Sequence, residues 1–258
     1  MKRFISIFCL LIVGLHAMAQ KQVVKNLTTF DDKRLHFGFT LALNALDFGI
    51  DHYPTIGLNP IVTPPTEDIN GKVITGDQRI RADVATLTPG FTVGIITNLR
   101  LSESLDLRFL PGMSFGERQL TYRDTQGFMP VEDINNKQDT ASYSIKSTFL
   151  DFPLLIKYKS RRMNNQRPYL IGGVACRIDI SKTGVEDLVR LKKLSTYVEA
   201  GMGWDMYLQF FRLSTELKFS FGLNNILDDG PKSTQKQVYT NAFSRLTSDM
   251  FILSFHFE

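Results

Sequence analysis

Side chains that could carry out catalysis gather at one place in the sequence, the stretch DFGIDHY at residues 47–53. Asp47, Asp51 and His52 are residue types that can activate a water molecule for hydrolysis. Such a site also needs a facing pair of acids, and the sequence places none opposite this stretch. We therefore interpret it as a solvated, turn-forming rim and keep a rim hydrolase as an alternative. The motifs H-E-x-x-H, G-x-G-x-x-G and the P-loop do not occur, and we expect no enzyme.

Two further histidines, His36 and His256, stand near the two ends of the chain. If those ends meet in a closed structure, the two rings could form a hydrogen-bonded pair at the seam. A metal ion would need more ligands, and the neighbouring positions Gly38 and Ser254 offer none. We expect no metal and no cofactor.

A basic stretch, KYKSRRMNNQR at residues 157–167, could bind an acidic partner or lipid headgroups. We favour the simpler interpretation of an ordinary charged turn. Its basic residues are Lys157, Lys159, Arg161, Arg162 and Arg167.

The first residues predict export from the cytoplasm. Lys2 and Arg3 form a basic region, an apolar run follows to Leu15, and Ala17-Met18-Ala19 is typical of a cleavage site. We expect residues 1–19 to be a signal peptide cut between Ala19 and Gln20, and residues 20–258 to form one domain.

The expected mature chain has nearly balanced charge. Removing Lys2 and Arg3 from the 30 Lys and Arg leaves 28 basic against 26 acidic residues. This balance gives no indication of a nucleic-acid surface. Cys176 is the one cysteine after residue 19, so an intramolecular disulfide is excluded.

The segments that must position these groups alternate apolar and polar residues with a period of two. Short and long connections also alternate, as in an up-and-down membrane barrel with periplasmic turns and external loops. The sequence therefore predicts an all-β, eight-stranded antiparallel transmembrane barrel. The expected strands cover residues 35–48, 88–99, 103–116, 149–158, 168–181, 196–208, 210–222 and 249–258.

One face of these strands is apolar and the other carries the charges. Charged residues inside a narrow barrel must neutralise one another, so the sequence predicts an ion-pair network that closes the lumen. Glycines share this face, at 38, 94, 112, 173, 201 and 203, and leave room for long side chains. The expected lumen charges are Asp106, Arg108, Asp151, Lys157, Arg177, Asp179, Glu199, Asp205, Arg212, Glu216 and Lys218.

The closing segment SDMFILSFHFE places Phe251, Leu253, Phe255 and Phe257 on one face. An even strand number gives this strand a partner on both sides. Phe251, Phe255 and Phe257 also resemble the signal read by the outer-membrane barrel insertion machinery, although Glu258 follows the last aromatic residue.

Four stretches resemble the PorT family of outer-membrane barrels: KRLHFGFTLALNALDF, FLDFPLLIKYK, RPYLIGGV and STYVEAGMGWDMYLQFFRLSTELKFSFGLNNIL. The resemblance implies an integral protein of a Gram-negative outer membrane that serves type IX protein secretion as a non-catalytic accessory. Its expected partners are outer-membrane lipid, the barrel insertion machinery and other secretion proteins. The alternative is a surface barrel whose loops bind external ligands or matrix.

Overall fold

The computed structural model describes residues 24–52, 66–67, 73–74, 80–124, 140–181, 191–228 and 243–258. The expected signal peptide and its cleavage site at Ala19 and Gln20 lie outside these residues.

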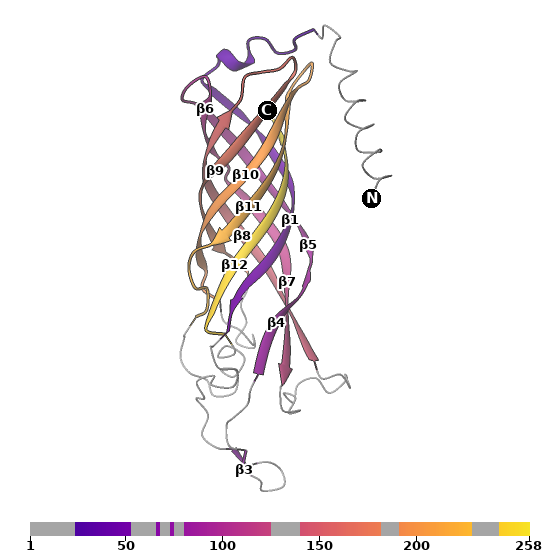
Figure 1. The fold of residues 1–258 in the computed structure, drawn as a ribbon, viewed down its shortest axis with the longest axis vertical. Coiled ribbons are helices and arrows are strands. Elements are labelled where there is room, and N and C mark those ends of the chain that lie inside the picture. The colour runs from indigo at the N-terminus through magenta and orange to yellow at the C-terminus, as the bar shows by residue number, and fades with distance from the viewer. Residues whose placement is uncertain are drawn as a thin grey trace, which may run out of the picture.

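The described chain forms a closed ring of eight antiparallel segments (Figure 1). Each segment, here called a stave, consists of one strand or of two consecutive strands. Two staves are each divided into two consecutive strands, so ten strands make up the sheet. The strands are β1 (Leu35–Asp51), β4 (Ile80–Leu87) with β5 (Pro89–Arg100), β6 (Leu105–Phe109) with β7 (Gly112–Asp124), β8 (Thr140–Lys159), β9 (Gln166–Asp179), β10 (Leu194–Tyr207), β11 (Arg212–Gly222) and β12 (Arg245–Phe257). The predicted fold class is confirmed.

Strand β1 shows why these residues form a membrane stave. Phe37, Phe39 and Leu43 are exposed, whereas Thr40 and Asn44 are buried inside the ring. Apolar side chains therefore face outward and polar ones inward, as alternation along a transmembrane strand requires.

The ring closes because β1 pairs with a strand along each of its two edges. β1 pairs with β12 from Phe39 opposite Phe257 to Asp51 opposite Arg245. Its other edge pairs with β5, from Leu35 opposite Leu99 to Ala45 opposite Pro89. The last strand therefore has β1 on one side and β11 on the other, so neither edge is left open.

One stave is interrupted at Leu110 and Pro111, between β6 and β7. Proline has no backbone N–H to donate, so it breaks the regular ladder. The register continues across the gap, because Leu110 donates to the carbonyl of Pro153 and Ile95 donates to the carbonyl of Pro111. The stave therefore keeps its alternation on both sides of the interruption.

The two ends of the ring differ. Short connections at residues 101–104, 160–165 and 208–211 lie at one end, here called the short-turn end (Figure 1). The start of β1 and the end of β12 lie at the same end. The opposite, long-loop end carries the connections 52–79, 125–139, 180–193 and 223–244; the first includes β2 (Thr66–Glu67) and β3 (Val73–Ile74).

Several staves are longer than the sequence predicts, mainly toward the long-loop end. Residues 140–148 of β8 extend beyond the β9 register and pair with β7, which in turn pairs with β4. Nine residues of strand correspond to roughly 30 Å. A three-stranded extension of β4, β7 and β8 therefore projects past the rest of the ring (Figure 1).

The only helix in the described part of the chain is the short 3-10 turn η1 (Phe30–Asp32). No helix there is long and apolar enough to cross a membrane.

Candidate functional site: the lumen and its short-turn mouth

All eleven expected lumen charges point into the ring and are buried. The centre of the network is Glu216, which is fully buried. Its Oε2 accepts hydrogen bonds from Arg108 at 2.7 Å and from the Tyr169 hydroxyl at 2.8 Å. The Nε2 atom of His256 lies 3.5 Å from the same oxygen.

Two further carboxylates are each held by several donors. Asp205 accepts from Lys157 Nζ at 2.7 Å on both oxygens and from Ser214 at 2.6 Å. Glu199 faces Arg177 at 2.5 Å and Lys218 at 2.7 Å. Because each charge has an opposite charge beside it, the interior can be filled without an uncompensated ion.

The remaining expected lumen charges fall into the same network. Asp151 lies 3.0 Å from Arg177 and accepts from Ser114. Asp106 lies 2.5 Å from Lys159, and Asp179 lies 3.8 Å from Arg118. The ion pairs therefore cross the lumen between many different staves.

A glycine makes room for the aromatic ring at the centre. A Cβ at Gly203 would lie 2.3 Å from the Tyr169 ring, so a larger residue would collide with it. Lys157 Nζ lies 3.7 Å from the centre of that ring. The cation–π contact places a second cation next to the carboxylates of the network.

Four charged lumen residues were missed by the sequence analysis: Arg118, Lys159, Arg167 and Glu258. The parity rule could have found them. Each lies an even number of residues from an expected inward-facing position on its own stave. Each was missed because it lies beyond the end of the expected strand or beyond the last expected inward-facing residue.

Above the ion network, toward the long-loop end, the lumen is apolar. Phe48 of β1 and Leu120 of β7 pack with Leu246 of β12 in one buried cluster. Residues from the long connections complete it: Ile226, Leu227 and Phe243. Arg118 joins the two layers, since its guanidinium lies 4.4 Å from the centre of the Phe48 ring.

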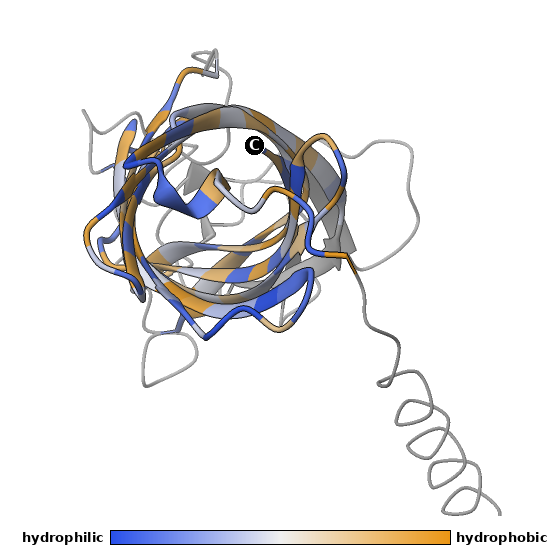
Figure 2. Cartoon of the chain, turned by 90° about the horizontal axis from the view of Figure 1, so that it is seen from above, coloured by the Kyte–Doolittle hydropathy of each residue, from blue (hydrophilic) through white to orange (hydrophobic). Residues whose placement is uncertain are grey.

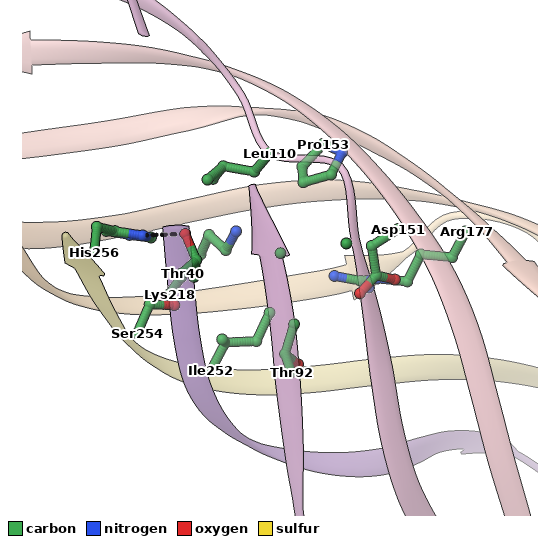
Figure 3. A pocket seen from close by; sticks show the side chains of 12 residues that line it. Thr40, Thr92, Leu110, Asp151, Pro153, Arg177, Lys218, Ile252, Ser254 and His256 are labelled. Atoms are coloured by element: carbon green, nitrogen blue, oxygen red, sulfur yellow. Dashed lines mark hydrogen bonds and ion pairs between the residues drawn. The ribbon is translucent and has the colours of Figure 1, made fainter. Parts of the chain in front are cut away.

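Within the ion network the lumen has a small cavity of about 30 Å³ (Figure 3). Thr40, Asp151, Lys218 and His256 line it, together with apolar side chains such as Ile252. A cavity of this size and polarity holds about one or two water molecules. A cavity of this volume is too small for an organic ligand.

The seam differs from the expected histidine pair. Nδ1 of His256 lies 2.8 Å from the Thr40 hydroxyl, its partner in the β1–β12 register. His36 lies four residues before Thr40, near the start of β1, where it contacts the carbonyl of Lys33 at 3.1 Å and stacks on Phe30. Among the described contacts, none joins the two histidines, because β1 extends past the last residue of β12.

The short-turn mouth is crossed by residues 24–34, here called the strap. Figure 2 looks into this end and shows the strap lying across the ring opening. The Phe30 ring stacks on His36 with 4.1 Å between centroids, and the Arg212 guanidinium lies 4.6 Å from its centre. The strap thus covers the ion network from the short-turn side.

Asp31 is the most heavily contacted polar residue of the strap. Its carboxylate accepts from the Tyr207 hydroxyl at 3.0 Å, and its Oδ1 lies 3.5 Å from Arg167. Arg162 lies 4.0 Å from Oδ2, and Arg100 donates to the backbone carbonyl. The basic stretch at 157–167 is therefore more than an ordinary charged turn, because it binds an acidic segment of its own chain.

The remaining strap contacts fix its backbone to the turn between β8 and β9. The side chain of Asn165 accepts from Asn26 N at 2.9 Å and donates to the carbonyl of Val24 at 2.8 Å. The sequence analysis missed the strap, because residues 24–34 show neither strand alternation nor a motif.

The expected rim stretch does not converge on one site. Asp47 lies opposite Asp249 in the β1–β12 register, on the outward-facing parity, and accepts from the N–H of Phe48. Asp51 and His52 follow at the end of β1, where their carbonyls accept from Ser244. No group of three or more metal-ligating side chains occurs in the part of the chain that the structure describes.

The C-terminal aromatic residues face outward from β12, and the Phe257 ring stacks on Phe39 at 4.7 Å. Glu258 points the other way, into the mouth. Its backbone exchanges hydrogen bonds with Arg212 at 2.8 and 3.0 Å, and its side chain pairs with the Arg212 guanidinium. The residue that follows Phe257 thus continues the inward-facing series.

Comparison with known proteins identifies the type of domain. The family model described as outer membrane protein beta-barrel domain matches residues 18–228. The N-terminal β-barrel domain of Pseudomonas aeruginosa OprF is a similar solved structure, with 12% identity and a TM-score of 0.31 over 86% of this chain and 98% of that one. No curated protein sequence matches the chain.

Proposed function

Because this chain belongs to the outer membrane protein beta-barrel domain family, we propose that it acts in the outer membrane as a non-catalytic accessory of protein secretion. The resemblance to PorT-type barrels in four stretches of sequence favours the type IX pathway. In this role the barrel contributes surfaces that bind other proteins, and its short-turn end faces the periplasm.

The observation that carries this proposal is the filled lumen. Three layers close it in succession: the strap at the short-turn mouth, the buried ion pairs in the middle, and the apolar cluster around Phe48 and Leu246. In the part of the chain that the structure describes, a small eight-stranded barrel filled in this way leaves no path for a solute or an unfolded chain. Its function must therefore lie at its ends or on its outer surface.

The experiment that tests the proposal compares the secreted proteins of a deletion strain with those of the same strain carrying the restored gene. Loss of one class of cargo, with that cargo retained in the periplasm and released again on complementation, supports the secretion role. An unchanged set of secreted proteins overturns it.

The second candidate function is binding of external ligands or matrix. The observation in its favour is the three-stranded extension of β4, β7 and β8, which carries the sheet beyond the rest of the ring at the long-loop end. This candidate predicts normal secretion but altered attachment in the deletion strain. Shortening the connection between β7 and β8, residues 125–139, should then reproduce the attachment defect while leaving the barrel folded.

A further inference from the structure

The strap fills the mouth with two adjacent side chains, and each occupies its own subsite. The Phe30 ring contacts both the His36 ring and the Arg212 guanidinium. The Asp31 carboxylate is surrounded by the Tyr207 hydroxyl and by Arg162 and Arg167. The mouth therefore holds an aromatic residue of the strap and the acidic residue that follows it.

The strap is held far less firmly than the network beneath it. Its residues are exposed or half-buried, and the side chain of Asp31 keeps 25% of its surface exposed. Arg108 and Glu216, by contrast, are 0% exposed. Partly solvated ion pairs contribute little stability, so the strap can leave the mouth without unfolding the ring.

The backbone of the strap also carries strain. Leu27 has a φ of 48°, in the left-handed region that residues with a side chain seldom adopt. Releasing the strap relieves this conformation, which lowers the cost of opening.

We propose that the short-turn mouth is a peptide-binding site, occupied here by the strap and able to exchange it for an aromatic–acidic segment of a partner protein. The inference goes beyond the proposed function, because it depends only on the geometry of the mouth. The partner supplies an aromatic ring for the His36–Arg212 subsite, a carboxylate for Arg162 and Arg167, and a backbone carbonyl for Arg100. Because the ion network stays below, the segment binds at the mouth and does not pass through.

A partner segment must compete with the strap, which is covalently joined to the barrel. Phe30 is joined to β1 by only four residues, so the strap is present at an effective concentration on the order of millimolar. A free peptide with the same contacts therefore binds poorly while the strap is intact. Weakening the strap should expose the site.

The test measures binding of a fluorescent peptide with the sequence of residues 25–34, KNLTTFDDKR, to the full-length mature barrel in detergent micelles. The double variant Phe30→Ala/Asp31→Asn should bind the peptide at least about tenfold more tightly than the wild type. Adding Arg167→Ala to that variant should weaken binding again. A peptide carrying the same two changes, which loses both side-chain contacts, is the matched control.

Equal binding of the peptide to the wild type and the double variant, or binding to neither, would overturn the proposal. Mobility on gels before and after heating reports whether each variant remains folded. If the double variant fails to fold, the single variant Asp31→Asn gives the same comparison, because Asp31 belongs to no strand and is partly exposed.

Discussion

Nη2 of Arg177 lies 2.5 Å from Oε1 of Glu199, and the two side chains are 1% and 0% exposed. Such a pair is stable only while both partners are present, because either charge alone would be buried without compensation. The Oε2 atom of Glu199 is engaged as well, by Lys218 at 2.7 Å. The lumen thus behaves as one electrostatic unit in which each charge depends on its neighbours.

Reversing the central charge should destabilise the barrel. Glu216→Lys removes the acceptor of Arg108 and Tyr169 and adds a cation beside Arg108, which should cost about 3–5 kcal/mol of unfolding free energy. Urea unfolding of the purified barrel measures the change. Glu103→Lys, in an exposed turn, is the control and should change little.

The same variant should leave the membrane impermeable, because Lys218, Asp205 and the strap still fill the lumen. Recordings in planar bilayers should show no conductance steps for the wild type or for Glu216→Lys. A channel that appears in the variant alone would contradict the filled-lumen interpretation.

Two adjacent glycines should respond differently to the same substitution. A Cβ at Gly173 would lie 2.3 Å from the carbonyl oxygen of Leu154. A Cβ at Gly172 would have only the backbone carbonyl oxygen of Glu199 nearby, at 3.5 Å. Gly173→Ala should therefore cost about 1–3 kcal/mol through overpacking. Gly172→Ala should be nearly neutral in the same unfolding assay. Similar losses of unfolding free energy for both variants would show that contact of the added Cβ with the neighbouring strand is not the cause of the destabilisation.

A charge on the outward face should be costly only within the apolar band. Met202 is 60% exposed on β10 and Met163 is 56% exposed in the turn between β8 and β9. Met202→Arg should cost up to about 2–4 kcal/mol, depending on its depth in the bilayer. Met163→Arg should be tolerated. Unfolding measured in lipid vesicles distinguishes the two, and equal effects would contradict the assigned membrane position.

The last two residues should have separable effects. Phe257→Ala alters the outward aromatic series, so the amount of barrel inserted in cells should fall. Glu258→Ala removes the partner of Arg212, so the purified barrel should be less stable while insertion proceeds normally. Insertion is measured by the heat-modifiable band in membrane fractions, and stability by urea unfolding. A reduced membrane level for Glu258→Ala alone would reverse this assignment.

Alternation made the staves and their inward faces predictable. The inward positions of Asp205 and Glu216, for example, follow from a period of two once the apolar face is assigned outward. The same rule failed only at strand ends, as at Arg118, where the expected strand stopped at residue 116 and the structure continues to Asp124.

The two covers of the lumen could not be predicted in this way. Ile226, Leu227 and Phe243 join the apolar cluster from connections that have no strand period. The strap depends on Phe30 and Asp31 meeting residues more than 100 positions away, including Tyr207 and Arg167. Contacts of that kind form only when the ring closes, so the local pattern of apolar and polar residues does not predict them.

The layered closure has a consequence for the cell. A barrel with an open channel would make the envelope leakier with every additional copy, so its abundance would be limited by toxicity. Among the described residues, the interior of this barrel is filled by side chains apart from a small cavity, so we expect additional copies to leave the permeability of the membrane unchanged.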